Sequence, residues 1–458
     1  MTSQHLAFAL LVLLVSAPHA HAEDPAPYDR GVTAFVHVNV IPMDEERVVQ
    51  DQTVIVRNGS IAAIGPAAEV RPPRRARVID GRGRYLIPAL ADMHVHLPFQ
   101  SYNAHEGPTL LQLFALNGVA TIMNQLGLPH HLELRERVAR GEVFGPMIWT
   151  SGMWINPPYF TTPEEVDTQV RAQRETGYDV IKIHGNLSRE AYGAVVAAAR
   201  RENMPLIGHI PRNLGVEPAI EERQGVVVHA EEYLYAYFLF NNRACCDNLD
   251  EDTRPLARRT ARAGTWLIPT LAVYKGIPAH IEDTDAALAR PEAAYLPPGV
   301  AAELGVNTRR WRGEPPERIP TLQALYRIQQ HLVLRFHEAG VRMMVGTDAP
   351  ANGAVLPGFS IHDEMADMVG AGLSPYRVLR AATVDPAEWR GDSNATGAVR
   401  VGLRADLILL DANPLDDIAA TRRRAGVMLR GRWISAAEAE QALAEIASAN
   451  ARADEIVP

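Results

Sequence analysis

The sequence predicts an α/β protein in which a (β/α)8 TIM-like barrel is inserted into a small β-sandwich built from both chain ends. From Leu86 to about Ala382, short apolar segments alternate with helical stretches, which is the pattern of βαβ units. Eight of these apolar segments are strand candidates, enough to close a barrel. The strand-like segments after Thr396 are too few to form a domain of their own, so we expect them to join the strands that precede the barrel.

Residues 1–22 have the pattern of a signal peptide. Leu6 to Val15 is an apolar run of suitable length, and Ala20-His21-Ala22 provides the small residues that signal peptidase reads. The run is too short for a stable bilayer span, which argues against the alternative of a membrane anchor. We expect cleavage after Ala22 and export of the mature protein to a periplasm or beyond.

Residues 30–85 and 396–435 are predicted to form the β-sandwich. Asn58-Gly59 is a hairpin turn between an alternating segment and its return. The segments expected as strands are 33–41, 53–57, 60–64, 405–411, 427–429 and 431–434. Residues 436–458 follow, and their richness in Ala and Glu up to Ala453 predicts a C-terminal helix.

Residues 86–395 are assigned to the barrel. Its first strand is the apolar run that ends at His94-Val95-His96, and the other strand candidates are 121–124, 147–151, 180–183, 206–209, 226–229, 266–271 and 343–346. Helices are expected at 163–176, 189–202 and 322–339. The first of these begins at Pro163, a residue favoured at the start of a helix, after Thr162 as a candidate N-cap.

Residues 275–320 interrupt the alternation of strands and helices. The segment is rich in Pro, Arg and Ala and has little periodicity. A loop of this length inside a compact domain is unusual and often functional. We expect either a cover over the barrel mouth or a solvated insertion.

Charge and cysteine content limit the possible partners. The formal net charge of -9 provides no basic face for phosphates, which argues against a nucleic-acid partner. No segment after the N-terminus is apolar for long enough to span a bilayer. The two cysteines, Cys245-Cys246, are adjacent, so they are either ordinary thiols or a strained vicinal disulfide and not a stabilising framework. A homo-oligomer remains an open alternative.

Histidines at strand ends are the main functional signal. His94 and His96 are two residues apart on a strand, so their side chains point to the same face. They lie at the carboxyl end of that strand, the edge at which active sites of parallel barrels form. His209 and His229 end the fifth and sixth strand candidates, and Asp348 follows the eighth. These side chains are candidate metal ligands.

Lys182 is expected in the fourth strand, between apolar neighbours. Burial disfavours its charged form, which makes a neutral amine available. A neutral amine can take up carbon dioxide and become a carbamate, a carboxylate-like group able to bridge two divalent metals. The alternative for Lys182 is an ion pair with a nearby carboxylate. A set of histidine and carboxylate ligands without thiolate suits zinc, ahead of manganese, cobalt or iron.

Two such metals would share a water molecule and convert it to hydroxide near neutral pH. Asp348 would accept the proton of that water and later deliver it to the leaving group. One metal would polarise the substrate carbonyl as a Lewis acid. The predicted chemistry is hydrolysis of an amide or an ester, and the expected partner is a small molecule or a short peptide.

These motifs resemble the metal-dependent amidohydrolase superfamily, in its imidazolonepropionase-like branch of prolidases, dipeptidases and ochratoxinase-like amidohydrolases. The run that ends at His96 is similar to the first strand of that family, and Gly346-Thr347-Asp348-Ala349 is similar to its eighth. The resemblance implies that His94, His96 and Asp348 hold one buried metal and that His209 and His229 hold a second. Lys182, as carboxylated lysine, would bridge the two metals and belong to the catalytic machinery with Asp348.

The substrate region departs from the peptidase-like members of that branch. After the third strand they often carry a histidine that is absent from Ser151–Asn156 here. His184 could contact substrate, Arg212 could pair with a substrate carboxylate, and Tyr233 could donate to a developing oxyanion. The respective alternatives are a loop histidine, a solvated arginine and a packed aromatic ring.

We therefore expect an exported binuclear hydrolase that cleaves an amide bond in a peptide or an N-acyl amino acid. Alternatives are a lactonase or esterase on the same scaffold, a deaminase, and a non-catalytic binding protein. Deaminases of this fold typically use one metal, so the bridging position of Lys182 argues against that alternative.

Overall fold

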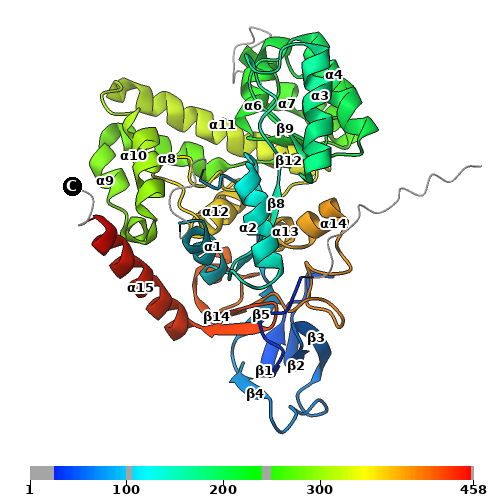
Figure 1. Ribbon diagram of the computed structural model, residues 1–458, viewed down its shortest axis with the longest axis vertical. Helices are drawn as coiled ribbons and strands as arrows, with labels where there is room; N and C mark the ends of the chain where they lie inside the picture. The colour runs from blue at the N-terminus through cyan, green and yellow to red at the C-terminus, as the bar shows by residue number, and fades with distance from the viewer. Residues whose placement is uncertain (1–24, 99–105, 240–248, 455–458) are drawn as a thin grey trace, which may run out of the picture.

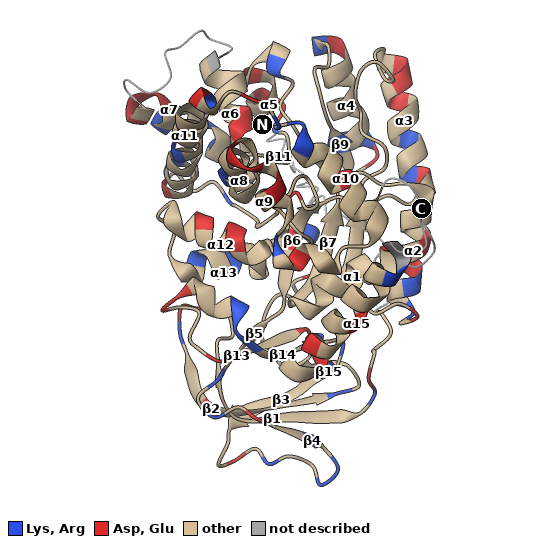
Figure 2. Ribbon diagram, turned by 90° about the vertical axis from the view of Figure 1, so that its left-hand side faces the viewer, with Lys and Arg blue, Asp and Glu red and all other residues tan. Residues whose placement is uncertain are grey.

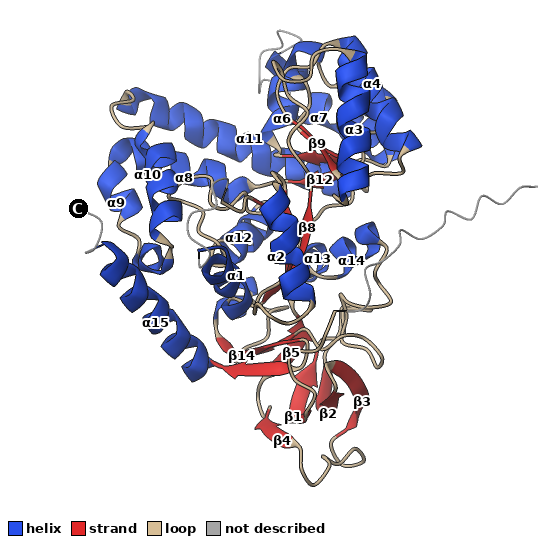
Figure 3. Ribbon diagram, in the orientation of Figure 1, coloured by secondary structure: helices blue, strands red, loops and turns tan. Residues whose placement is uncertain are grey.

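The computed structural model describes residues 25–98, 106–239 and 249–454. The predicted signal peptide and its cleavage site, Cys245-Cys246, and the last four residues lie outside the described residues. Figure 1 shows a sheet that contains strands from both ends of the chain, and next to it a larger region of helices and short strands. Figure 3 shows that helices dominate this larger region and strands the smaller one.

The smaller region is one mixed sheet in which both chain ends take part. Its strand order is β15-β14-β13-β5-β1-β2-β3, and β4 pairs with β1. The ends join where β13 runs antiparallel to β5. Phe35 and Trp433, from opposite ends of the chain, pack edge to face with ring centroids 5.2 Å apart. The strands are β1 (Val32–Val40), β2 (Val49–Arg57), β3 (Ser60–Pro66), β4 (Arg77–Asp80), β5 (Tyr85–Pro88), β13 (Leu407–Leu410), β14 (Arg424–Leu429) and β15 (Arg432–Ser435).

The run that was predicted as one strand ending at His96 is two strands. Its first part, β5, belongs to the mixed sheet, whereas its second part, β6, begins the parallel strands of the larger region. Ala89 lies between them and its amide donates to the carbonyl of Asp406. The passage from one region to the other therefore occurs inside an apolar run, where hydrophobicity gives no boundary signal.

The larger region contains two parallel sheets. One has the order β6-β7-β8 and the other β12-β11-β10-β9. Single bridges connect β8 to β9 through Ser151 and Val180. Their strands are β6 (Leu90–Val95), β7 (Val119–Asn124), β8 (Met147–Thr150), β9 (Ile181–Ile183), β10 (Leu206–Gly208), β11 (Val226–Val228) and β12 (Trp266–Ile268).

The eighth predicted strand, residues 343–346, is not a strand in the structure. Met343 forms only a single bridge, to Leu267, and Ala349 forms one to Val95. The segment runs between β12 and β6, but Thr347 donates its amide to the side chain of Asp92 and not to a neighbouring strand. Asp348 then turns the chain with φ of 63°. Backbone pairing with β6 is present again at Asp348, whose amide donates to the carbonyl of His94 at 2.7 Å.

Fifteen α-helices occur in the described residues, and several begin as the sequence predicts. In α3, Thr162 accepts a hydrogen bond from the amide of Glu165 at 3.2 Å, which caps the helix that starts at Pro163. The helices are α1 (Glu106–Leu116), α2 (Pro129–Ala139), α3 (Pro163–Thr176), α4 (Arg189–Arg201), α5 (Glu217–Glu221), α6 (Glu231–Tyr233), α7 (Leu249–Ala263), α8 (Leu271–Glu282), α9 (Thr284–Leu288), α10 (Pro298–Arg309), α11 (Ile319–Glu338), α12 (Ile361–Gly370), α13 (Pro375–Ala382), α14 (Val384–Arg390) and α15 (Ala436–Asp454).

The expectation of little regular structure in residues 275–320 is wrong. The segment contains the end of α8, then α9 and α10, and the short 3-10 helices η3 (Pro291–Tyr295) and η4 (Pro316–Arg318). The remaining short elements are the 3-10 helices η1 (Arg212–Leu214) and η5 (Ile418–Arg422) and the π-helix η2 (Leu234–Leu239). Prolines stand in the first turns of η3, α10 and η4, where a missing N–H costs nothing, whereas Pro278 lies inside α8. Most prolines of this segment therefore begin helices.

Charged residues of both signs lie along the outer helices, as Figure 2 shows for α3 and α7. Many form exposed ion pairs, for example Arg171 with Asp167 at 3.1 Å along α3. Within the described part of the chain, no helix combines the length and the apolar character needed to cross a membrane.

Candidate metal centre

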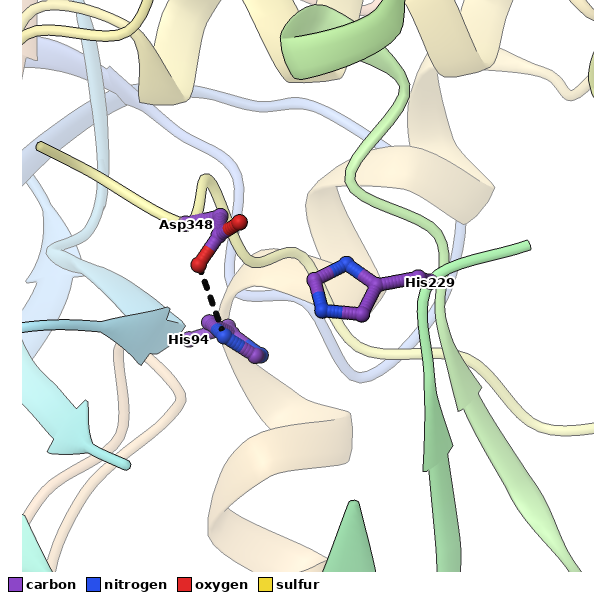
Figure 4. Close-up of side chains that lie close together, drawn as sticks. All are labelled: His94, His229 and Asp348. Carbon is purple, nitrogen blue, oxygen red and sulfur yellow. Dashed lines mark ion pairs between the residues drawn. The ribbon is translucent and has the colours of Figure 1, made fainter. Parts of the chain in front are cut away.

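Two histidines and one carboxylate meet at the end of β6. The Nε2 atoms of His94 and His96 lie 3.3 Å apart. Each lies 2.9 Å from the same oxygen, Oδ1 of Asp348. Figure 4 shows Asp348 and His94 facing each other, with the ring of His229 beside them. The side-chain period of two along the strand therefore does bring the pair to one side.

This donor set fits a divalent cation. Ligand atoms of His94, His229 and Asp348 all lie within 4.8 Å of one another. Imidazole nitrogens and carboxylate oxygens are ligands that zinc prefers. Three acceptor-rich groups that converge on one point in the protein interior are stabilised when a cation lies among them.

His209 and His229 complete the ring of imidazoles. His229 has its Nδ1 2.7 Å from the hydroxyl of Thr270, and His209 has its Nδ1 2.8 Å from Oε1 of Glu232. Both contacts leave Nε2 as the available ligand atom. The His229 ring centroid lies 4.8 Å from that of His94 and 4.7 Å from that of His209, so His229 links the first pair to His209.

Burial sets the charge of these groups. Desolvation lowers the pKa of His94, His209 and His229 well below the usual value, so their lone pairs are available at neutral pH. Desolvation alone would raise the pKa of Asp348, but the adjacent His94 and His96 hold it well below its usual range. His94, His209 and His229 are thus neutral imidazoles and Asp348 is an ionised carboxylate, the states in which these groups bind metals.

Lys182 is buried in β9, with 1 % of its surface exposed. Its Nζ donates to Oε1 of Gln125 at 2.7 Å. Desolvation lowers the pKa of Lys182 to about 7, against the opposing effect of the carboxylates of Asp348 and Glu232. A substantial fraction of this amine is therefore neutral at physiological pH.

Asp92 hydrogen-bonds to both chain segments that carry the first candidate ligands. It is fully buried and accepts hydrogen bonds from the amide and the hydroxyl of Thr347, at 3.0 and 2.7 Å, and from the amide of His94 at 3.3 Å. Burial raises the pKa of Asp92 to about 7, although these hydrogen bonds oppose the shift. The side chain fixes the loop that carries Asp348 against the strand that carries His94.

The three predicted substrate residues have different surroundings. The structure brings His184 to the centre: its ring stacks on Trp154 at 4.3 Å and lies 4.5 Å from the ring of His209. Arg212 is held by Glu232 at 2.7 Å and Glu231 at 3.2 Å, which opposes its predicted role as the partner of a substrate carboxylate.

Tyr233 is not brought together with the metal ligands. Its buried ring packs against Phe336 of α11, with centroids 4.7 Å apart. The chain enters α6 directly after His229, and this helix turns Tyr233 into the helical layer. The oxyanion role predicted for Tyr233 therefore has no support in the structure.

The sequence did not reveal the polar residues that hydrogen-bond to the candidate metal ligands and to Lys182. Glu232 lies three residues after His229, and Gln125 directly follows β7 at the same edge as the ligands. The position of either residue in the sequence could have indicated that it lies near the site. No sequence signal marks Thr270, which reaches His229 from 41 residues away in the chain.

Comparison with known families identifies the family of this chain. The family model described as the amidohydrolase family matches residues 85–434. The chain belongs to the amidohydrolase family. The predicted membership is confirmed, and the enzyme class, a metal-dependent hydrolase of C–N bonds, is confirmed at the level of the family.

Individual relatives of this amidohydrolase are distant. It is 24 % identical to an imidazolonepropionase of Rubrobacter xylanophilus over 81 % of this chain and 87 % of that protein. It is 32 % identical to an N-substituted formamide deformylase of Arthrobacter pascens over 26 % of this chain, and the match spans only 22 % of that relative. The solved structure of a putative prolidase from Bifidobacterium longum is similar as well, with 24 % identity and a TM-score of 0.68. This match covers 91 % of this chain and 99 % of the prolidase chain.

The Gly346→Ala variant of this amidohydrolase is expected to lose stability and metal affinity. A Cβ at Gly346 would lie 2.5 Å from Cγ2 of Ile268 and 2.8 Å from Cβ of His94, so β6 must shift. Overpacking of this kind costs about 1–3 kcal/mol. Denaturant unfolding and a metal titration measure the two effects.

Gly193→Ala is the matched control for this variant. Gly193 lies inside α4 and a Cβ there would contact nothing within 4 Å. Alanine should therefore stabilise the protein by about 0.5–1 kcal/mol. Equal stability of the two variants would contradict the close packing described for Gly346.

Proposed function

We propose that this chain is an exported, binuclear metal-dependent amidohydrolase that cleaves an amide bond in a short peptide or an N-acyl amino acid. The observation that carries the proposal is the convergence of His94 and His96 on one oxygen of Asp348. The neighbouring imidazoles of His229 and His209 and the buried amine of Lys182 supply the donors for a second cation. The names of its relatives, a formamide deformylase and a putative prolidase, both imply hydrolysis at a C–N bond.

The parallel strands of this protein close into a barrel. The bridges of Ser151 with Val180, Leu267 with Met343 and Val95 with Ala349 support this closure, because they connect the edges of the two parallel sheets. His94, His96 and Asp348 would hold one zinc ion, and His209 and His229 would hold a second. A carboxylated Lys182 would supply a further oxygen donor to both.

Asp348 moves the proton in the reaction. When bound, the cations supply a nucleophilic water at neutral pH and polarise the substrate carbonyl. The ionised carboxylate of Asp348 accepts the proton of that water and passes it to the leaving nitrogen as the C–N bond breaks. Thr270 and Glu232 hold the rings of His229 and His209 in place during these steps.

A substrate panel with the zinc-loaded protein tests the proposal. The panel contains unblocked dipeptides, N-acyl amino acids, lactones, simple esters and amino-purines or amino-pyrimidines. We expect turnover of amides that stops after chelation and returns with zinc. Lactone or ester turnover without amide turnover, or ammonia release from the heterocycles, would contradict the proposed amide hydrolysis.

Export is tested separately, on the protein from its own cells. We expect Edman sequencing of the mature protein to begin at Glu23, directly after Ala22. An intact N-terminus in a cytoplasmic fraction would contradict the proposed export and leave the proposed chemistry untouched.

A further inference from the structure

A small cavity opens beside the metal centre and has a distinctive lining. It has a volume of about 160 Å³, and His96 and Trp154 form the wall nearest the metal ligands. An apolar cavity of similar size, roughly 150 Å³, admits benzene. The cavity therefore has room for one side chain of moderate size.

Helix α10 supplies the opposite wall. Val300, Glu303 and Asn307 are spaced three and four residues apart along this helix, so they form one stripe that faces the cavity. The other lining residues are mostly apolar: Leu97, Pro98, Leu126, Pro350 and Ala351. Glu303 thus places a carboxylate at an otherwise apolar cavity.

The carboxylate of Glu303 lacks a cation of its own. Across residues 25–98, 106–239 and 249–454, the structure shows no ion pair or hydrogen bond of the Glu303 side chain. Glu303 is half-buried, so its charge is less well solvated than that of a fully exposed glutamate. A bound cation would compensate the charge of Glu303.

We infer that Glu303 binds the free α-ammonium group of the residue whose carbonyl reacts, so that the substrates are unblocked peptides with an apolar N-terminal side chain. This inference rests on the proposed amide hydrolysis. His96 and Glu303 line the same cavity, so a cation bound at Glu303 would lie beside the substrate carbonyl at the metal centre. An α-ammonium group meets that condition, whereas the neutral amide of an N-acyl amino acid gives Glu303 no charge to bind.

A binding experiment tests the cation site without catalysis. Phenethylamine and phenethyl alcohol have the same ring and chain length, and only the amine is a cation at neutral pH. We expect calorimetry on the zinc-loaded protein to give at least about tenfold tighter binding of the amine, the worth of one charge-assisted hydrogen bond. Glu303→Gln should remove this preference. Glu282→Gln, an exposed glutamate at the end of α8, should keep it.

A kinetic experiment tests the position of the cation. Phenylalanyl-alanine and its desamino analogue, 3-phenylpropanoyl-alanine, differ only in the α-ammonium group. We expect kcat/KM to favour the unblocked peptide by at least about tenfold, through KM, and Glu303→Gln to abolish the preference. Equal turnover of both compounds, or a preference that survives Glu303→Gln, would overturn the role of Glu303 and leave amide hydrolysis intact.

The two proposals fail in different ways. If neither compound is cleaved but lactones or esters are, amide hydrolysis is wrong and the inferred substrate class falls with it. Binding that shows no preference for phenethylamine overturns the cation site whatever reaction the enzyme performs.

Discussion

Replacement of Asp348 by asparagine is expected to lower kcat by about 10²–10⁴-fold while the fold stays intact. Asparagine has the shape of aspartate but cannot accept and return a proton at this position. The substitution also suits the backbone, because Asp348 has φ of 63° and asparagine tolerates the left-handed region better than most residues. Steady-state kinetics against an unblocked dipeptide, together with circular dichroism, measures both parts of the prediction.

Two controls separate the proton-transfer role of Asp348 from general damage. Asp416→Asn changes an exposed aspartate in the same way and should leave kcat unchanged. The metal content of Asp348→Asn must be measured as well, because the carboxylate oxygen faces both His94 and His96. Unchanged hydrolysis by Asp348→Asn would rule out Asp348 as the group that moves the proton.

The convergence of the candidate metal ligands could be predicted because local sequence determines where these side chains point. A side chain at the carboxyl end of a parallel strand faces the edge where sites form, and this holds for His94, His209 and His229. The start of α3 was predictable for the same reason, since Thr162 and Pro163 act within one turn of helix.

Contacts between distant parts of the chain could not be predicted in this way. The hydrogen bond of Asp92 with Thr347 joins residues 255 positions apart, and only the assembled fold brings them together. Tyr233 points into the helical layer because α6 follows His229 at once, a change of direction that short apolar segments do not reveal. The lack of periodicity in residues 275–320 predicted a loop, although most prolines of the segment stand at helix starts.

The use of lysine in this chain bears on the role of Lys182. The 45 basic residues include only two lysines, Lys182 and Lys275, and all the others are arginines. Arginine cannot lose its proton in a protein, whereas a buried lysine can. Lys275 is exposed and forms an ion pair with Asp367, whereas Lys182 is buried, where a lysine can become neutral. A reacting amine at position 182 requires lysine, and an ion pair would not.

Carboxylation of Lys182 should be visible by mass. Nζ forms a bond to the carbon of carbon dioxide and releases a proton, so the intact protein gains the mass of one carbon dioxide. We expect this increment in native spectra at neutral pH, its loss after acidification, and two equivalents of zinc per chain. Lys275 is the internal control, because its side chain is 57 % exposed and forms an ion pair with Asp367.

Variants of Lys182 distinguish the carbamate from an ion pair. Lys182→Met keeps an unbranched side chain of similar length in a site that is 1 % exposed, and Lys182→Arg keeps the positive charge. If the lysine carries a carbamate, both variants should lose the second equivalent of zinc and at least about 10²-fold in kcat. If Lys182 serves only as the cation partner of Asp348, Lys182→Arg should retain the zinc content and most of the activity. Retention by the arginine variant would therefore exclude the bridging role, because a guanidinium can neither take up carbon dioxide nor ligate a metal.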